Sequence, residues 1–305
     1  MLNRFNIINE RLASNQNENA SILVYINPTD QEKSYLVNEL NLDEHTLNSS
    51  LDPDELSRIE FEPNHSAIIF KVPRNYSANE QFIFRVVSIG VFLFSDKLII
   101  ITSDEIPLFD GKQFNRITSL IDLMLKLIYR SIYHYLDHLK VMNMISESLE
   151  LKINESMENK YLLNLFSLEK SLVYYVNAIN SNTYVIEKIR HYSSKMSISG
   201  DSQELLDDII IENRQCYKQA EIYSNILASM MDARVSIVSN NLNVLMKTLN
   251  IITITIMVPT LVVSAFSMNV TIPLQQHPLA FWIIMGFAFL SITGFVIFWR
   301  YIKKW

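Results

Sequence analysis

The segment TLNIITITIMVPTLVVSAFSMNVTIPLQQHPLAFWIIMGFAFLSITGFVIFW (248–299) carries no formally charged side chain over 52 consecutive residues. A water-exposed surface of that length would carry charges, so this part of the chain is expected to lie in a lipid bilayer. Pro273 and Pro278 separate two apolar stretches, 251–268 and 279–299. Because an α-helix needs about 20 residues to cross about 30 Å of hydrocarbon, the two stretches predict two membrane-spanning helices joined by a tight hairpin.

The charges on either side of this hairpin predict its orientation. The 32 Asp and Glu residues of the chain all lie at or before Asp232, and the loop 269–278 contains no Lys or Arg. By the positive-inside rule, both ends of the chain are expected in the cytoplasm, with the hairpin in the inner or plasma membrane. The opening sequence lacks the apolar stretch of a signal peptide, so residues 1 to about 247 are expected to be cytoplasmic. The basic residues that flank the spans are Lys247, Arg300, Lys303 and Lys304.

The first 110 residues favour an α/β unit. Short runs rich in Val, Ile and Phe and bounded by Pro, Asn or Asp are typical of strands in one sheet. The uncharged run 86–95 is too short to cross a membrane and predicts a buried strand. Strands are expected at 21–27, 67–72, 82–89 and 97–103, and helices at 30–41 and 53–59.

Helix-breaking residues are scarce in the next part of the chain. No proline lies between Pro107 and Pro259, which predicts a few long helices at about 113–145, at about 147–195 and from Ser202 onward. If the last helix continues through the first span, it is about 100 Å long at 1.5 Å per residue. A helix of that length needs partners, and copies of the same chain are the simplest ones.

The expected fold class is an α+β cytoplasmic domain with long stalk helices plus two C-terminal transmembrane helices. Its expected parts are a cytoplasmic α/β domain (1–110), a cytoplasmic helical region (111–201), a stalk helix continuing into the first transmembrane helix (202–268, the span from about 248), a periplasmic hairpin loop (269–278), the second transmembrane helix (279–299) and a basic cytoplasmic tail (300–305).

A polar stripe follows one side of the first span. Its members recur at intervals of three, four and seven residues, which keeps them on one face of a helix. One interpretation is that Thr and Ser bond to their own helix and that small residues mediate helix packing. The other is a water-filled lumen on a symmetry axis, which an amide without acidic neighbours, Asn250, favours. The stripe consists of Asn243, Asn250, Thr253, Thr260 and Ser264, with Met246 and Met257 close to the same line.

At the end of the first span, directly after this stripe, Phe266 precedes Ser267, Met268 and Asn269. This segment resembles the CorA family of divalent-cation transporters, whose signature is Gly-Met-Asn after an aromatic residue at this place. The resemblance covers nearly the whole chain. It includes SNNLNVLMKTLNIITITIMVPTLVVSAFSMNVTIP (239–273), SLDPDELSRIEFEPNHSAIIF (50–70), IGVFLFSDKLIIITS (89–103), LEKSLVYYVNAINSN (168–182) and LLDDIIIENRQCYKQAEIYSNILASMMDA (205–233).

This resemblance implies a homopentameric funnel that takes up Mg²⁺, and Co²⁺ as a further cargo, driven by the membrane potential. Asn269 would form a ring at the periplasmic mouth that holds the hydrated ion. The path inward would be lined by Ser264, Thr260, Met257, Thr253, Leu249, Met246 and Asn243, with Met246 and Leu249 as the apolar gate. Periodicity alone prefers Asn250 to Leu249, so the edge of the lining stays open there. The resemblance also implies a regulatory Mg²⁺ carboxylate at Asp208, with Asp207 and Glu204 nearby; the alternative is that these acids only favour a helix N-terminus.

Two departures from the family leave other functions open. Ser267 replaces the family glycine, which would strain the chain if this position needs a positive φ. The hairpin loop has no acidic residue to concentrate cations. The alternatives are a transporter of another divalent ion such as Zn²⁺, or a membrane-tethered sensor or scaffold that conducts nothing.

Several other functions find no support in the sequence. No constellation of nucleophile, base or organic cofactor motif indicates an enzyme, no phosphate-binding Gly-Lys loop is present, and no nucleic-acid partner is expected. His134, Asp137 and His138 have a spacing that can bind zinc, although a solvated or interfacial helix face is the favoured interpretation because no further ligand lies nearby in the sequence. Cys216, the single cysteine, is expected to be a small buried apolar residue.

Overall fold

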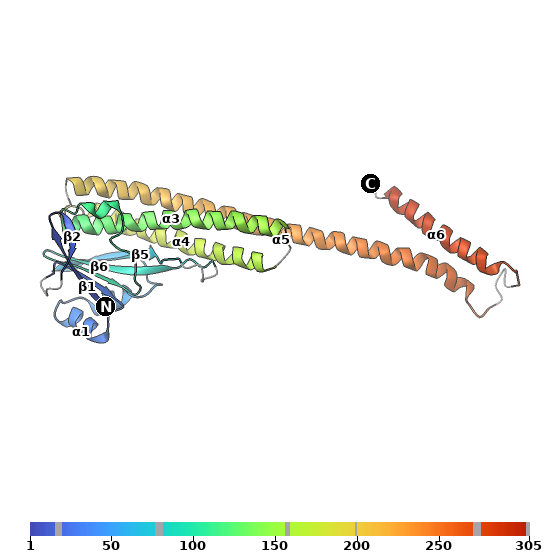
Figure 1. Cartoon of the computed structure of the whole chain (residues 1–305), viewed down its shortest axis with the longest axis horizontal. Helices are drawn as coiled ribbons and strands as arrows, with labels where there is room; N and C mark the ends of the chain where they lie inside the picture. Colours follow the sequence, from blue (N-terminus) through green and yellow to red (C-terminus); the bar gives the residue numbers. More distant parts are fainter. Residues whose placement is uncertain (16–19, 77–81, 156–158, 199, 271–275, 303–305) are drawn as a thin grey trace. The chain divides into compact units, whose positions relative to one another are not determined.

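A computed structural model describes residues 1–15, 20–76, 82–155, 159–198, 200–270 and 276–302 (Figure 1). The chain divides into two compact units, Met1–Met231 and Asp232–Trp305. The division falls inside one helix, α5 (Asp201–Phe266). The sheet and the helices of the first unit share one hydrophobic core.

The first unit is built on one seven-stranded sheet in the order β2-β1-β3-β7-β6-β5-β4. Neighbouring strands are antiparallel except for the central pair of β3 and β7. Both of these strands are buried, as expected where both faces of a sheet are covered. The strands are β1 (Leu2–Ile8), β2 (Arg11–Ser14), β3 (Ile22–Ile26), β4 (Arg58–Phe61), β5 (His65–Pro73), β6 (Val86–Phe94) and β7 (Leu98–Thr102).

Helices cover both faces of the sheet, and β7 shows why. Ile99 and Ile101 belong to a small cluster with α1 (Asp30–Asn38) and α2 (Glu44–Ser49). Leu98 and Ile100, on the alternate side, belong to the large cluster with the long helices. Both short helices begin at a capping residue, Thr29 for α1 and Asp43 for α2, whose side chain accepts a backbone N–H.

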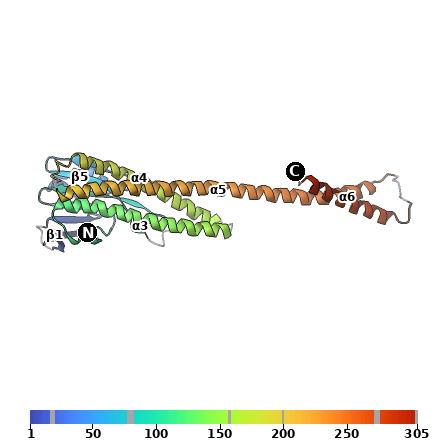
Figure 2. The same ribbon diagram turned by 90° about the horizontal axis from the view of Figure 1, so that it is seen from above.

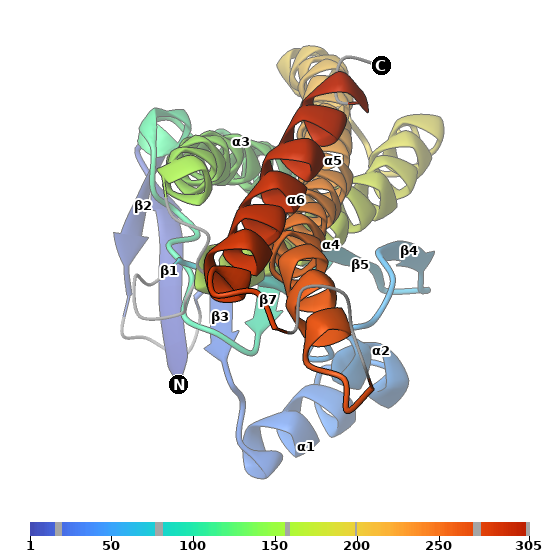
Figure 3. The same cartoon turned by 90° about the vertical axis from the view of Figure 1, so that its right-hand side faces the viewer.

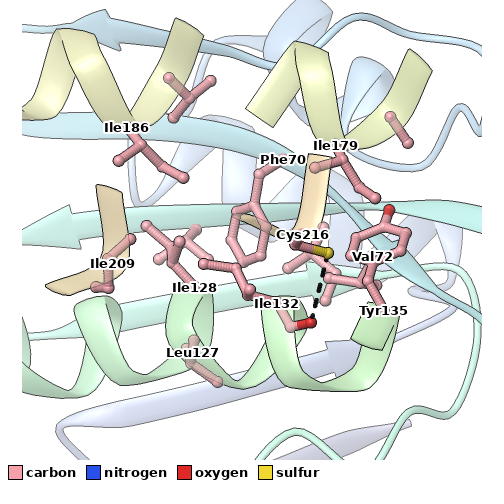
Figure 4. Packing of buried hydrophobic residues seen from close by; sticks show 14 of the residues in the cluster. Phe70, Val72, Leu127, Ile128, Ile132, Tyr135, Ile179, Ile186, Ile209 and Cys216 are labelled. Atoms are coloured by element: carbon pink, nitrogen blue, oxygen red, sulfur yellow. Dashed lines mark hydrogen bonds between the residues drawn. The ribbon is translucent and has the colours of Figure 1, made fainter. Parts of the chain in front are cut away.

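The long helices pack side by side on the other face (Figure 2). They are α3 (Leu120–Glu155), α4 (Asn159–His191) and the part of α5 that ends at Met231. Figure 4 shows their shared core, in which Phe70 of β5 lies among Ile132, Ile179 and Cys216. Cys216 is fully buried, as predicted, and burial raises the pKa of its thiol to about 12.

The sequence predicted most of these elements and missed some. The four predicted strands are confirmed as β3, β5, β6 and β7, and the buried strand at 86–95 is β6. The helix predicted at 53–59 is wrong, because this segment is a loop that leads into β4. The hairpin of β1 and β2 was not predicted, since its turn uses Asn9 and Glu10 at φ values of 50° and 59° in place of glycine. The predicted helices at 113–145 and 147–195 are displaced, because α3 begins at Leu120 and α4 at Asn159.

The second unit contains the rest of α5 and α6 (Ala280–Ile302). Both helices are long and apolar enough to cross a membrane, and their most apolar windows are 0% and 6% buried. Pro259 lies inside α5 and removes one backbone donor from the helix. Large apolar side chains are exposed along both helices, so this unit has no core of its own among the described residues.

Candidate functional site

The predicted polar stripe lies on one exposed face of α5. At about 100° per residue, Thr253, Met257, Thr260 and Ser264 fall within an arc of about 60°. All four side chains are exposed in the chain. Leu249 and Asn250 lie on opposite sides of this line, so helix geometry alone does not choose between them. The remaining members, Asn243 and Met246, are also exposed.

The opposite face of the same helix is half-buried. Ile251, Thr255, Val258, Val262 and Phe266 are all half-buried, and about 100° per residue places them across the helix from the stripe. The Phe266 ring stacks on Phe287 of α6, with centroids 6.3 Å apart and planes 7° apart. Figures 1 and 3 show α6 near α5 at the hairpin end and diverging from it toward the C-terminus. The ring contact between the two helices therefore lies on the side of α5 away from the stripe, and the stripe residues stay exposed.

The threonine hydroxyls of the stripe bond back to their own helix. Thr253 Oγ1 donates to the carbonyl of Leu249 at 2.9 Å, and Thr260 Oγ1 donates to that of Ile256 at 2.7 Å. Thr255, on the opposite face, does the same, so this contact is not specific to the stripe. Such bonds belong to the first of the two interpretations, and they are compatible with the second. They leave the hydroxyl oxygens as hydrogen-bond acceptors, which suits the hydrogens of a cation's bound water.

The signature residues follow directly after the last turn of α5. Ser267 donates its backbone N–H to the carbonyl of Ser264 at 3.1 Å, and its Oγ donates to the same carbonyl at 2.9 Å. Ser267 is absent from the residues with positive φ in the described chain. The strain expected from replacing glycine therefore does not arise. Met268 and Asn269 are exposed, and residues 271–275 of the loop lie outside the described part.

The predicted regulatory acids lie in the first unit at the start of α5. Asp207 is engaged by Arg190 of α4, with N···O at 3.3 Å. Asp208 and Glu204 are exposed. Among the described residues, no group of three or more His, Cys, Asp and Glu side chains could hold a metal ion. A site at Asp208 within a single chain is therefore incomplete.

The histidine motif of α3 lies partly at an interfacial helix face, one of the alternatives expected from the sequence, because His138 contacts α4. His138 is 9% exposed and its Nδ1 lies 2.7 Å from the Tyr175 hydroxyl, whereas Asp137 points away and pairs with Lys140 at 3.5 Å. Burial lowers the pKa of His134 and of His138 to about 4. The motif is thus not a zinc site in the described chain, and His138 is not on a solvated face.

The predicted membrane anchors are only partly described. Lys247 and Arg300 are exposed at opposite ends of the apolar segment, and Lys303 and Lys304 lie outside the described residues.

The sequence analysis missed Lys71, whose buried ammonium donates to the carbonyl of Pro53 at 2.6 Å and to Ser88 Oγ at 3.0 Å. A lysine in an apolar strand was the only available signal.

Comparisons with known proteins identify the family of the chain. A family model described as "CorA-like Mg2+ transporter protein" matches residues 13–304. The chain is 25% identical over 288 residues to the cobalt/magnesium transport protein CorA of Methanocaldococcus jannaschii, covering 90% of this chain and 87% of that protein.

Solved structures show the same fold. The complete structure of the CorA magnesium transporter from Methanocaldococcus jannaschii matches with a TM-score of 0.80 and 22% identity, over 98% of this chain and 96% of that one. The full-length CmaX protein matches with a TM-score of 0.71 and 14% identity, over 99% and 96%. Since the family model spans nearly the whole sequence, the chain belongs to the CorA-like Mg²⁺ transporter family and is a divalent-cation transport protein of the membrane, not an enzyme.

Proposed function

We propose that copies of this chain form a pore that takes up hydrated Mg²⁺, and Co²⁺ as a second cargo, through the face of α5 that carries the polar stripe. One observation supports this most directly: the stripe is exposed across the helix from the side that α6 meets, and it leads to Asn269. A lipid-facing surface would gain nothing from aligned amide and hydroxyl groups. On a surface that faces water and ions, the same groups can form hydrogen bonds.

The chemistry of the lining suits magnesium. Mg²⁺ prefers oxygen ligands and gives up its bound water reluctantly. A ring of neutral Asn269 carbonyls can accept hydrogen bonds from that water without removing it, and it binds weakly enough to release the ion. The Thr253 and Thr260 oxygens offer further acceptors along the path, and Met246 with Leu249 would form the dry constriction of a gate.

The membrane potential supplies the driving force in this proposal. Moving one charge through 100 mV is worth about 2.3 kcal/mol, so a divalent ion gains about 4.6 kcal/mol on entry. Both termini are then cytoplasmic and the signature residues face outward, in the inner or plasma membrane. Uptake needs no nucleotide hydrolysis.

The pore requires several copies, because one helix face cannot enclose a path. We propose a homopentamer, as the family resemblance implies, with α5 innermost and α6 toward the lipid. Native mass spectrometry of the protein in detergent tests the subunit number. A monomer or a dimer would contradict this part of the proposal.

A regulatory Mg²⁺ between neighbouring copies is the second part of the proposal. Asp208 is exposed, whereas Arg190 holds Asp207. An ion shared by Asp208 and Glu204 with a neighbouring copy would stabilise the closed state at high internal Mg²⁺. Asp208→Asn is then expected to weaken inhibition by internal Mg²⁺ and to leave ion selectivity unchanged. Unchanged inhibition in vesicles would leave Asp208 as a surface acid.

The stripe itself is tested by matched threonine variants in a bacterium that lacks Mg²⁺ uptake. Wild type is expected to restore growth at low Mg²⁺. Thr260→Val removes an oxygen from the stripe and is expected to slow uptake about tenfold, the cost of about one lost hydrogen bond. Thr255→Val removes the same group, with the same bond to its own helix, from the opposite face and should grow like wild type. Equal effects of the two variants would contradict the stripe as the pore lining.

A further inference from the structure

The first unit has a cleft that the transport proposal does not use. It has a volume of about 490 Å³ and lies between α4, the segment that enters β6, and the loop that holds Pro53 and Asp54. This volume is within the range of about 300–1,000 Å³ typical of small-molecule sites. Every residue that forms it belongs to the first unit, so the cleft exists in a single copy of the chain.

Aromatic and aliphatic side chains are exposed around this cleft. Phe166 is 55% exposed, Tyr174 is 49% exposed and Ile83 is 39% exposed. Phe166 and Tyr174 are eight residues apart on α4 and therefore lie on one face of the helix. Two exposed rings beside one hollow provide surfaces on which a flat, partly apolar ligand can stack.

Two cations line the same hollow without a carboxylate partner in the described chain. Arg85 is exposed and forms no ion pair with a described residue, and the Lys170 ammonium lies 5.9 Å from the centroid of the Tyr174 ring. This is unusual for a unit that holds all 32 acidic residues of the chain save Asp232. A guanidinium binds phosphate through two parallel hydrogen bonds, and an ammonium adds a second positive charge.

The lining of the cleft also includes one acidic residue, Asp54, and the positively charged Lys71 lies near it. Asp54 is exposed at the mouth of the cleft, next to Pro53, whose carbonyl accepts a hydrogen bond from the buried Lys71 ammonium. Ser88 Oγ fixes the preceding carbonyl, that of Asp52, at 2.5 Å. The backbone before Asp54 is therefore held in place, and the Asp54 carboxylate can accept hydrogen bonds from hydroxyl or amino groups of a ligand.

The floor of the cleft is also fixed before any ligand arrives. The backbone N–H of Phe84 donates to Ser171 Oγ at 3.1 Å, and that hydroxyl donates to the carbonyl of Ser167 at 2.8 Å. These bonds tie the segment before β6 to α4. A site that needs little rearrangement loses less free energy on binding.

We propose that this cleft binds a nucleoside phosphate, with Arg85 and Lys170 on the phosphates, the base stacked against Phe166 or Tyr174, and Asp54 accepting from a hydroxyl or amino group. Inorganic phosphate would use only the cations, and an apolar molecule would use only the rings. A nucleotide uses both. This proposal concerns binding to the first unit and does not depend on transport.

Isothermal titration of the full-length protein in detergent tests it, with ATP, adenosine and inorganic tripolyphosphate as separate probes in Mg²⁺-free buffer. ATP is expected to bind more tightly than either other probe. Arg85→Gln and Lys170→Gln should each weaken ATP binding about tenfold or more, the loss expected for a charge-assisted hydrogen bond. Phe166→Ser should weaken ATP binding about tenfold and leave tripolyphosphate binding unchanged.

Two controls match these variants. Lys152→Gln removes a lysine whose ammonium lies 6.0 Å from the Tyr161 ring, a similar contact between residues that do not line the cleft, and should not change binding. Leu163→Ser removes an exposed apolar side chain one turn from Phe166 and should not change it either.

Three outcomes overturn the proposal. The first is no ATP binding at concentrations up to about 1 mM, which corresponds to about −4 kcal/mol. The second is equal binding of ATP and tripolyphosphate that Phe166→Ser does not affect, which would make the cleft a simple charged patch. The third is loss of a higher-order assembly in Phe166→Ser, which would make the exposed rings a contact between copies.

Discussion

Large aliphatic side chains form a buried core in the first unit of this chain and are largely exposed in the second. In the first unit, Ile99, Ile100 and Ile101 of β7 are fully buried, and Leu206 of α5 is 0% exposed. In the second unit, Leu261 of the same helix is 73% exposed. The first unit therefore stabilises itself by burying its own apolar surface. The second leaves that surface exposed, as suits a segment in contact with lipid, so the two parts of one helix have different surroundings.

The largest expected effect separates the two parts of α5. Leu206→Ala should destabilise the first unit by about 2–5 kcal/mol, whereas Leu261→Ala should leave it unchanged. Labelling of Cys216 with a thiol reagent measures this, because the chain has one cysteine and that thiol is buried. The reagent reaches it only when the first unit opens. Labelling of Leu206→Ala should be at least about 30-fold faster. Equal rates in both variants would mean that the units are not independent.

A smaller effect is expected where α4 meets the sheet. Asn182 Oδ1 accepts the backbone N–H of Lys71 at 2.8 Å, and its Nδ2 donates to the Lys71 carbonyl at 2.8 Å. Asn182→Leu leaves these buried groups unpaired and should cost about 1–3 kcal/mol in the unfolding of the first unit. Thermal unfolding measures the loss. The exposed Asn177→Leu on the same helix is the control, and an equal change in both variants would contradict the role of Asn182.

Acid is expected to weaken the first unit through its buried histidines. The pKa of His134 falls from 6.5 to about 4 through burial, with smaller contributions from His138 and Arg130, while Asp137 opposes the change. Below about pH 6.5 His134 is protonated in the unfolded chain, whereas in the folded chain it stays neutral until about pH 4. The folding free energy from this group is therefore lost as pH falls through that window.

His134→Phe should flatten the dependence of the thermal midpoint on pH between about 6.5 and 4. The exposed His191→Phe on α4 should not. A wild-type slope in His134→Phe would show that carboxylates alone govern acid stability.

The smallest effect is expected at the end of α5 in the second unit. Ser267 does not need a positive φ, so Ser267→Gly should neither raise nor lower Mg²⁺ uptake by more than about twofold, since it removes only one hydroxyl contact to Ser264. Flux into vesicles measures it. A large loss would mean that the serine hydroxyl builds a different pore mouth, and a large gain would mean that the glycine of the family is functionally required.

How far the sequence predicted this molecule differs between the units for physical reasons. The apolar spans were predictable because hydrocarbon thickness sets their length, and the strands β3, β5, β6 and β7 because buried central strands are continuously apolar. The hairpin of β1 and β2 at the edge of the sheet was not predictable, since its side chains are half-buried and its turn has no glycine. The loop at 53–57 resembles a helix start, but Lys71 and Ser88 hold its carbonyls from the sheet, a contact that no local pattern shows.

The candidate site was predictable for a similar reason. A polar stripe with helical period is recognisable from the order of the residues alone, and α5 presents it as one exposed face. The interactions that carry no period were not predictable. His138 bonds to Tyr175 across two helices, and Asp207 pairs with Arg190 across another interface. Both contacts depend on residues that only folding brings together.

The central proposal is that Asn269, three residues after the end of α5, forms a ring of amides that admits hydrated Mg²⁺. Its most direct test is Mg²⁺ flux into liposomes that contain the purified protein, at a membrane potential set by a potassium gradient. Wild type and Gln276→Ala, which removes an exposed amide beyond the ring, should conduct equally, whereas Asn269→Ala should abolish flux while the assembly stays intact. Undiminished flux through Asn269→Ala would contradict the account.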